Sequence, residues 1–473
     1  MAESYGLNFF ETVFELVSWD EMNTVASYAG FPIRYPHWRF GMQYEQMSKG
    51  YAYGLHKIFE LVINNDPCYA YLLRGNTPVD QKMVMAHVYA HCDFFKNSLW
   101  FAPTNRHMVD ELASHATRIA RYVDEEGRTE VEQFLDSCLS LENLIDVYAP
   151  YAPCKRDAEN GDEARRSPVR FDAKPYMDPF INPPQVLAEQ RRRIEKERRK
   201  SPRFPERPQR DVLLFLIECA PLKPWQRDIL SMIREEAYYF APQSLTRIMN
   251  EGWASYWHST IMTRDVLEDH EVVDYADRHA GTMGVQPGRI NPYKLGLELF
   301  RDIEGRWNKG RFGKEYDDCD DLDAKRRWDT GLGAGRQKIF EVRRIYNDVT
   351  FVDEFLTEDF CERQKLFVYR RNPKSGRSEI VSRDFGAVRE GLLRGLANGG
   401  HPLVEVTDAN VGNRAELRLK HRHDGQDLHL GYATETLKHL CRLWTRPVHL
   451  ETVVEGRPKR FSHDGEKVET ADL

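Results

Sequence analysis

The sequence lacks the features typical of membrane-embedded, secreted and nucleic-acid-binding proteins. No uninterrupted apolar run approaches the roughly 20 residues that a membrane span needs. The eight cysteines include no C-x-x-C pair, which favours reduced thiols in a cytoplasmic protein over a disulfide framework. A formal net charge of −7 gives no overall attraction to nucleic acid. Residues 1–8 have neither a basic start nor an apolar core, so we expect no signal peptide and a cytoplasmic location.

Several signatures of catalysis and nucleic-acid binding are missing as well. The glycine-rich run 331–336 follows no strand-like pattern and precedes no Lys-Ser or Lys-Thr, so it does not predict a phosphate-binding loop. No Ser-His-Asp arrangement or reactive-cysteine pattern stands out. The charged segment 191–200 lacks interleaved aromatic residues, which favours a solvated helix over a nucleic-acid contact. We therefore expect no nucleic-acid partner.

What is present suits a globular protein of two or three domains, since 41% of the 473 residues are hydrophobic. The pattern predicts a helical N-terminal part of a main lobe (1–150), a charged linker with a helix (151–210), a helical second part (211–360), a small α+β domain (361–460) and a loose tail (461–473). The predicted fold class is α+β, with a large mainly α-helical lobe that carries any site and a small C-terminal α+β domain.

Local periodicity gives the finer elements of this prediction. Helices are expected at 44–63, 78–95, 105–125, 129–147, 384–398 and 431–444. Strands are expected at 366–369, 403–406, 415–419 and 448–454. Residues 212–217 fit either a buried strand or a helix.

Two stretches far apart in the chain look like the halves of one metal site. His87 and His91 lie four residues apart, so on a helix they share a face and could bind a single cation. Glu251 could complete the site from a second helix, and the small residues Gly252 and Ala254 would let that helix approach. The mixed nitrogen and oxygen ligands favour Zn²⁺, with other divalent metals as alternatives.

Neighbouring residues could support these ligands. His258 stands seven residues after Glu251, about 10 Å along a straight helix, so one ion cannot easily bind both. We therefore expect His258 beside the ligands or on the substrate side, Asp93 as a carboxylate that orients a ligand imidazole, and Tyr256 close by. The alternative is a packed core, in which the histidines hydrogen-bond their neighbours and Glu251 caps a helix or pairs with an arginine.

The two stretches resemble gluzincin metallopeptidases, in which an H-E-x-x-H helix supplies two ligands and a later N-E-G-x-A helix supplies the third. The resemblance implies that His87, His91 and Glu251 are the ligands. This chain departs from the pattern at Val88, which stands where gluzincins have the general-base glutamate. A hydrolase of this kind would need another carboxylate as its base.

Two further groups of polar residues are candidates for that role. His107, Glu111 and His115 are spaced four and four, which predicts a polar stripe on one helix beside the histidine pair. Glu111 and His115 are favoured, as a fourth ligand, the base or a second ion site; a surface stripe stabilised by its own ion pairs is an equal alternative. Glu235 and Glu236 point about 100° apart on a helix, so at most one would replace the base. A dimetal bundle ranks lower, because the E-x-x-H spacing typical of such sites is absent.

Seven segments carry a second resemblance: 36–42, 65–71, 87–95, 234–240, 250–258, 419–423 and 446–452. Together they resemble the SpoVR family, named for stage V sporulation protein R, over nearly the whole chain. The resemblance implies a role in spore-cortex formation or envelope peptidoglycan metabolism, with protein partners in the cell-wall, stress or sporulation machinery. Two functions compete: a metal-dependent hydrolase of amide or peptide bonds, and a non-catalytic regulator with a structural or degenerate metal site. Val88 favours the regulator, and the polar groups at 107–115 and 235–236 favour the hydrolase.

Overall fold

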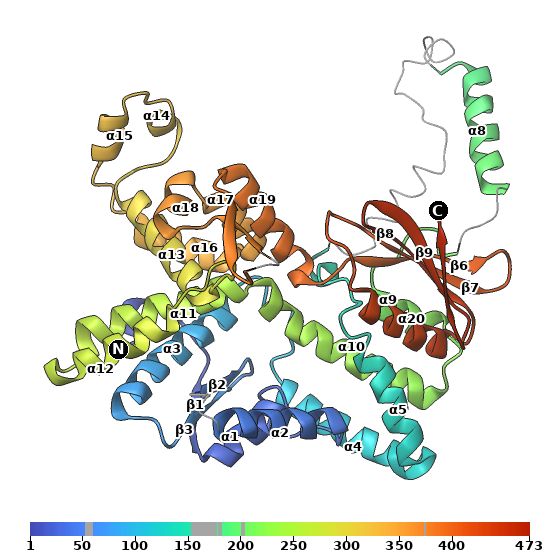
Figure 1. Cartoon of the computed structure of the whole chain (residues 1–473), viewed down its shortest axis with the longest axis horizontal. Coiled ribbons are helices and arrows are strands. Elements are labelled where there is room, and N and C mark those ends of the chain that lie inside the picture. Colours follow the sequence, from blue (N-terminus) through green and yellow to red (C-terminus); the bar gives the residue numbers. More distant parts are fainter. Residues whose placement is uncertain (53–59, 153–176, 178–181, 200–203, 373–374) are drawn as a thin grey trace. The chain divides into compact units, whose positions relative to one another are not determined.

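The computed structural model describes residues 1–52, 60–152, 177, 182–199, 204–372 and 375–473 (Figure 1). The chain forms two compact units, each made from two stretches. Unit 1 comprises Met1–Leu135 and Glu235–His401, and unit 2 comprises Asp136–Arg234 and Pro402–Leu473. The predicted fold class is confirmed, since a large, mainly helical part is accompanied by a small C-terminal α+β part. The boundaries differ from those predicted, because residues 361–401 belong to unit 1 and residues 136–234 belong with the C-terminal sheet.

Unit 1 consists mainly of helices. They are α1 (Trp19–Ser27), α2 (Trp38–Ala52), α3 (Pro78–Asn97), α4 (Met108–Glu126), α11 (Arg247–Ile261), α12 (Val272–Thr282), α13 (Pro292–Asn308), α14 (Lys314–Asp317), α15 (Leu322–Arg327), α16 (Gly335–Ile345), α17 (Asp348–Phe355), α18 (Glu358–Gln364) and α19 (Phe385–Leu396). Two more helices, α5 (Arg128–Leu139) and α10 (Pro224–Leu245), each contain a point where the chain passes from one unit to the other.

A three-stranded sheet lies beside α3, in the order β1 (Thr12–Val17), β3 (Cys68–Leu73), β2 (Glu60–Ile63) (Figure 1). β1 runs parallel to β3, and β2 runs antiparallel to it with Glu60 opposite Leu72. The predicted helix over 44–63 is therefore wrong at its end, where residues 60–63 form β2 and residues 53–59 lie outside the described part. Four residues are too few for an alternation of apolar and polar side chains to be recognised. Residues 60–63 are extended because they pair with the edge of β3.

Helix α3 has a well-defined start and one apolar face. The Thr77 side chain accepts from the Asp80 backbone N–H, and the Asp80 side chain accepts from the Thr77 backbone N–H, which together form a capping box. Val84, Val88 and Cys92 pack against β3 in one buried cluster. The histidines of α3 lie on a different face of the same helix.

Helix α11 packs between α3 and α13. Its first turn is capped by Asp348, which accepts the backbone N–H groups of Ile248 at 2.8 Å and Met249 at 2.9 Å. Gly252 faces Gly296 of α13 so closely that a Cβ on either would overlap the backbone of the other helix. Gly252 thus permits contact with α13, whereas the sequence prediction had assigned this small residue to the approach between the two helices of the metal site.

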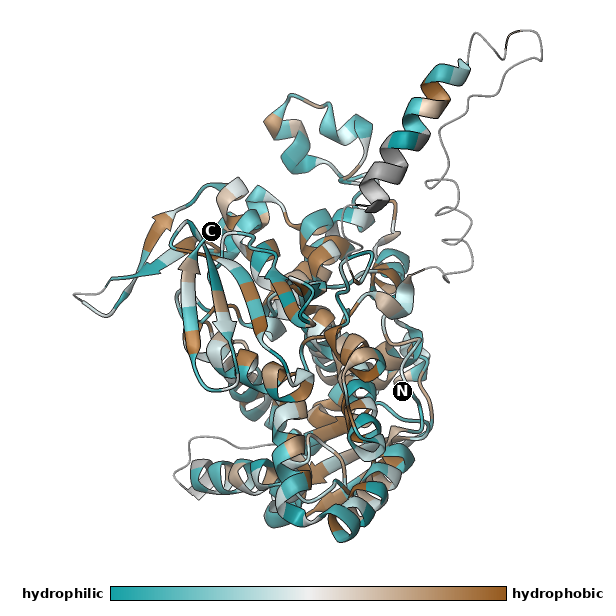
Figure 2. Cartoon of the chain, turned by 90° about the vertical axis from the view of Figure 1, so that its right-hand side faces the viewer, coloured by the Kyte–Doolittle hydropathy of each residue, from teal (hydrophilic) through white to brown (hydrophobic). Residues whose placement is uncertain are grey.

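Unit 2 contains a five-stranded sheet in the order β10 (Val468–Asp472), β9 (Arg457–His463), β8 (Val448–Val454), β7 (Glu416–His421), β6 (Val404–Val411). Neighbouring strands are antiparallel except for the parallel pair β7–β8. The strands of this sheet carry both hydrophobic and hydrophilic residues (Figure 2), and along Val448–Val453 of β8 buried positions alternate with partly exposed ones. The helices of the unit include α8 (Pro184–Arg199), α9 (Val212–Cys219) and α20 (Leu430–Trp444), and the ring of Phe215 stacks on Trp444 at 5.8 Å.

Two predictions about the C-terminal part need correction. Residues 461–473 do not form a loose tail, because β10 pairs with β9 along five residues. An edge strand such as β10 can be held by backbone hydrogen bonds alone. Its sequence is polar and shows no strand pattern, so the sequence analysis did not predict it. The strand expected at 366–369 is β4 (Val368–Arg371), which pairs with β5 (Ser378–Ser382) inside unit 1 instead of joining the C-terminal sheet.

The predicted linker 151–210 is only partly within the described residues. Residues 153–176, 178–181 and 200–203 lie outside them, and the charged helix expected at 191–200 is the last part of α8. Among the described residues, the helices are all too short or too polar to span a bilayer.

Candidate metal centre

The two predicted histidine ligands lie together on one face of α3 and are both buried. His87 Nδ1 lies 3.0 Å from Nδ1 of His258, and His91 Nδ1 lies 2.9 Å from the side-chain oxygen of Asn250. Since that oxygen only accepts, His91 carries its proton on Nδ1 and presents an Nε2 lone pair. This is the tautomer of a metal-bound histidine whose other nitrogen is held by a protein partner.

Two carboxylates approach the Nε2 atoms of these histidines. Glu251 Oε2 lies 3.7 Å from His87 Nε2 and 3.6 Å from His91 Nε2, and Glu60 Oε1 lies 3.7 Å from His87 Nε2. These separations are too long for hydrogen bonds. They are close to the roughly 3.4 Å between two atoms that each bind a tetrahedral ion at about 2.1 Å. Glu60, His87 and His91 also form a group whose ligand atoms all lie within 4.8 Å of one another.

The pKa values reflect the burial of this cluster. Burial raises the pKa of Glu60 to about 7, lowers the pKa of His91 to about 4 and holds the pKa of His258 well below its usual value. At His87 burial acts to lower the pKa, but the carboxylates of Glu60 and Glu251 outweigh it and the pKa is raised. At Glu251 burial is outweighed by the two imidazoles, so its pKa is lowered. A divalent cation bound here would replace His87 as the positive charge beside the Glu251 carboxylate.

The cluster lines a pocket of about 640 Å³. His258 and Tyr293 also line it, and α12 contributes Arg278 and Thr282. The ring of Tyr293 lies roughly parallel to that of His87, with centroids 6.2 Å apart. The pocket therefore offers an approach to the histidines for a ligand larger than water.

Several predicted neighbours of the site lie elsewhere, which corrects the sequence analysis. Asp93 orients neither imidazole; its carboxylate accepts from the Trp253 indole at 2.9 Å and the Asn8 backbone at 2.8 Å. Tyr256 donates to Glu304 at 2.7 Å, away from the pocket lining. These residues tie helices together, because a buried carboxylate or hydroxyl must find a partner wherever packing supplies one.

The second polar stripe was predicted beside the histidine pair, and the structure separates the two. Glu111, His115 and Glu235 form their own group of potential ligands, with Glu236 hydrogen-bonded to His115, and none of them lines the pocket. His107 precedes the first turn of α4, is exposed and belongs to neither group.

The sequence analysis missed Glu60, the carboxylate that approaches His87. Val88, at the position of the expected base, has no exposed surface and packs against the sheet, so a side chain there would point away from the pocket. Glu60 instead enters from the first residue of β2. A short strand inside a stretch with helical spacing gave no signal for it.

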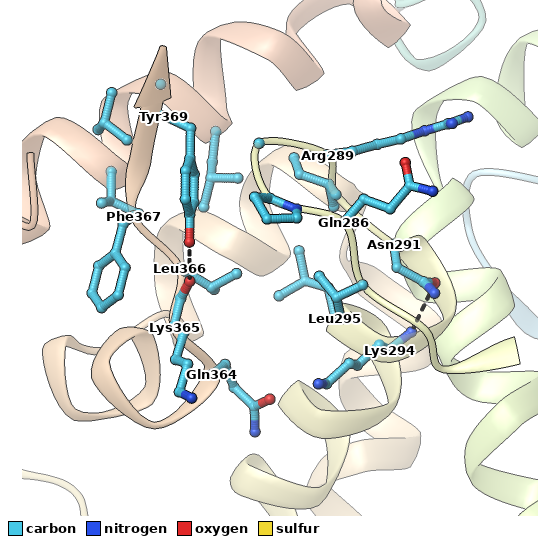
Figure 3. A pocket seen from close by; sticks show the side chains of 18 residues that line it. Gln286, Arg289, Asn291, Lys294, Leu295, Gln364, Lys365, Leu366, Phe367 and Tyr369 are labelled. Atoms are coloured by element: carbon cyan, nitrogen blue, oxygen red, sulfur yellow. Dashed lines mark hydrogen bonds between the residues drawn. The ribbon is translucent and has the colours of Figure 1, made fainter. Parts of the chain in front are cut away.

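A second pocket, of about 300 Å³, is lined mostly by apolar side chains together with Arg289, Lys294 and Lys365 (Figure 3). The Tyr369 hydroxyl donates to the Lys365 carbonyl at 3.4 Å across one wall (Figure 3). None of the described residues that line this pocket carries a carboxylate or an imidazole, so they do not provide the ligands of a metal centre.

The fold and the site together define a mainly helical protein whose described residues include two groups of histidine and glutamate side chains that could hold metal ions. The chain belongs to the SpoVR family, as the sequence predicted. The family described as SpoVR like protein matches residues 1–401, and the SpoVR-like C-terminal domain matches residues 402–455. The boundary between these matches coincides with the last passage of the chain from unit 1 to unit 2.

A similar protein is found in Escherichia coli strain K12. Its uncharacterized protein YcgB is 29% identical to this chain over 478 residues, which cover 95% of this chain and 89% of YcgB. No solved structure matches the chain. The likeness of the metal motif to gluzincins stays a prediction from the sequence.

Proposed function

We propose that this protein is a Zn²⁺-dependent hydrolase of amide or peptide bonds, with the ion bound by His87, His91 and Glu251. One observation carries the proposal: both Nε2 atoms face the same Glu251 oxygen, at 3.7 and 3.6 Å, on the wall of a pocket. Two imidazoles and one carboxylate are the ligand set of many catalytic zinc sites.

Protein side chains around the ligands have separate roles in this proposal. A bound Zn²⁺ would polarise a substrate carbonyl and acidify a water molecule. We assign proton transfer to Glu60, because its carboxylate reaches the ligand cluster from the same pocket. We assign Tyr293, which lines the pocket and interacts with Glu251 through its hydroxyl, to holding that ligand carboxylate in place.

A second function is favoured by the position of Glu60 itself. Its ligand atom lies within 4.8 Å of those of both histidines, so Glu60 could instead complete a closed site of two histidines and two glutamates. A site with four protein ligands is structural. The protein would then be a non-catalytic regulator of cell-wall assembly.

Membership of the SpoVR family supports a biological setting for either function. We propose that the protein acts in the cytoplasm, in sporulation or in envelope peptidoglycan metabolism. Its targets would be peptide-containing peptidoglycan precursors or proteins of the cell-wall, stress or sporulation machinery.

Metal analysis of variants tests the site and separates the two functions. Elemental analysis of purified protein should find zinc, and His91→Ala should lose one equivalent while keeping its circular dichroism spectrum. Glu60→Gln is the discriminating variant, and Glu15→Gln, an exposed glutamate on β1 of the same sheet, is its matched control. Amide hydrolysis is measured as the release of primary amines from soluble peptidoglycan-precursor peptides.

The hydrolase proposal expects Glu60→Gln to keep its zinc and to lose activity by about 10²–10⁴-fold. Loss of zinc from Glu60→Gln would favour the closed, structural site. If folded His91→Ala and wild type contain equal zinc, the proposed metal centre is wrong.

A further inference from the structure

We propose that Glu111, His115 and Glu235 form a second site for a divalent metal cation. Glu111 and His115 lie one turn apart on α4, and Glu235 comes from α10. One ligand atom of each residue lies within 4.8 Å of the others. The site shares no residue with the proposed zinc centre, so the two proposals stand or fail separately.

The imidazole of His115 is held in the orientation that a metal ligand needs. His115 Nδ1 lies 3.1 Å from Glu236 Oε1, and Arg34 donates to the other Glu236 oxygen at 2.6 Å. Because a carboxylate oxygen accepts this hydrogen bond, Nδ1 is the donor, and Nε2 is the nitrogen that a cation would bind. Carboxylates bonded to the far nitrogen of a histidine orient metal-bound imidazoles in many sites.

The free Nε2 atom is the observation that points to a cation. The His115 side chain has no exposed surface, and within the described residues Nε2 has no hydrogen-bond partner. Glu235 Oε2 lies 3.5 Å from it. That distance resembles the roughly 3.4 Å between two ligands of a tetrahedral ion. A buried nitrogen lone pair without a partner destabilises the protein, and a bound cation would remove this penalty.

The charges around His115 also favour a divalent cation. Three carboxylates and one guanidinium, that of Arg34, lie around the His115 imidazole, so acidic groups outnumber the basic side chain. In the part of the chain that the structure describes, neither Glu111 nor Glu235 pairs with a lysine or an arginine. Among the described residues Glu111 forms no ion pair along α4 either, so the self-paired surface stripe, which was the alternative from the sequence, does not account for this carboxylate.

The ligand set and its exposure indicate the kind of ion. One imidazole and two carboxylates suit first-row cations such as Mn²⁺ and Zn²⁺. The side chain of Glu235 is 47% exposed, so the ion would be open to water and to exchange. Loading of the purified protein from solution should therefore be rapid and reversible.

Counting bound ions in the full-length chain tests this site. The protein is stripped with a chelator and dialysed against Mn²⁺, and separately against Zn²⁺, before elemental analysis. The test variant carries Glu111→Gln and Glu235→Gln, which keep the shape of two partly exposed side chains. Glu125→Gln is the matched control, because Glu125 is an exposed glutamate of α4 that pairs with Arg121. Glu251→Gln reports on the first centre.

We expect the double variant to bind one ion fewer than wild type with at least one of the two metals, and Glu125→Gln to bind as many as wild type. An unchanged count in the double variant with both metals overturns the second site. A loss in Glu251→Gln alone would support the zinc centre and reject this one. The opposite pattern would reject the zinc centre and support this one.

The orienting role of Glu236 has its own readout. Glu236→Gln should weaken Mn²⁺ binding at this site by about 10–100-fold, as removal of such a partner commonly does. Thermal unfolding of the metal-free variant separates this effect from a general loss of stability. Metal affinity equal to that of wild type would overturn the orienting role.

Discussion

Replacing Gly252 with alanine should force α11 and α13 apart. A Cβ at this position would lie 2.9 Å from the backbone nitrogen of Leu297, and closer still to the backbone of Gly296. Ordinary contacts need about 3.5–4.0 Å, so the helices must separate by at least ~0.6 Å. Neither obstacle is a side chain that could turn away, so the backbone itself has to move.

The net effect combines a gain and a loss. Alanine in place of a helical glycine adds about 1 kcal/mol through helix propensity. Overpacking a core costs about 1–3 kcal/mol, and a backbone clash belongs at or above the upper end. We expect Gly252→Ala to lower the free energy of unfolding by about 2 kcal/mol, after the ~1 kcal/mol gain is subtracted from ~3 kcal/mol.

Gly305→Ala on α13 is the matched control, because a Cβ there meets nothing within 4 Å. It should raise the free energy of unfolding by about 1 kcal/mol. At roughly 2 °C per kcal/mol for a unit of this size, the two variants should differ in Tm by about 6 °C in a calorimetric scan. Equal Tm increases in both variants would refute the close approach of the two helices. Since Gly252 follows Glu251, only Gly252→Ala should also weaken Zn²⁺ binding.

Other contacts give further predictions. Burial raises the pKa of Asp348 to about 7, so folding favours its protonated form. As the pH rises from about 4 to about 7, the free energy of unfolding of the wild type should therefore fall by up to about 1.4 kcal/mol per pH unit. In urea unfolding, Asp348→Asn should show a smaller dependence of this free energy on pH. Trp253→Phe removes the donor to Asp93 and should cost about 1–3 kcal/mol in the same assay. Chelation of the metal should lower Tm, since an ion at 1,000 times its Kd adds about 4 kcal/mol. Removal of β10 should expose the edge of β9 and increase aggregation measured by light scattering.

Much of the helical architecture could be predicted because its signals are local. The helical spacing over 78–95 identified α3, and with it the shared face of His87 and His91. The distance from the histidines to Glu251 depends on packing between helices, yet the motif pairing anticipated it. Spacing rules succeed where one helix fixes the geometry.

The remaining contacts depend on pairing between distant segments. Glu60 reaches the histidines only because β2 joins the edge of β3, and nothing in four residues encodes that partner. Asp93 lies two residues from His91 and still faces Trp253, since neighbouring positions on a helix point in different directions. Sequence proximity to a ligand therefore did not predict membership of the site.

The interleaved division of the chain has a consequence for its synthesis. Unit 2 needs residues 136–234 and also residues 402–473, with most of unit 1 translated between them. At about 5–20 residues per second, the first stretch waits roughly 12–50 s for its partner. During that time Phe215 of α9 lacks Trp444, its stacking partner from α20. Slow translation, or a message cut near codon 401, would prolong the exposure of this apolar helix and make the nascent chain a client for chaperones.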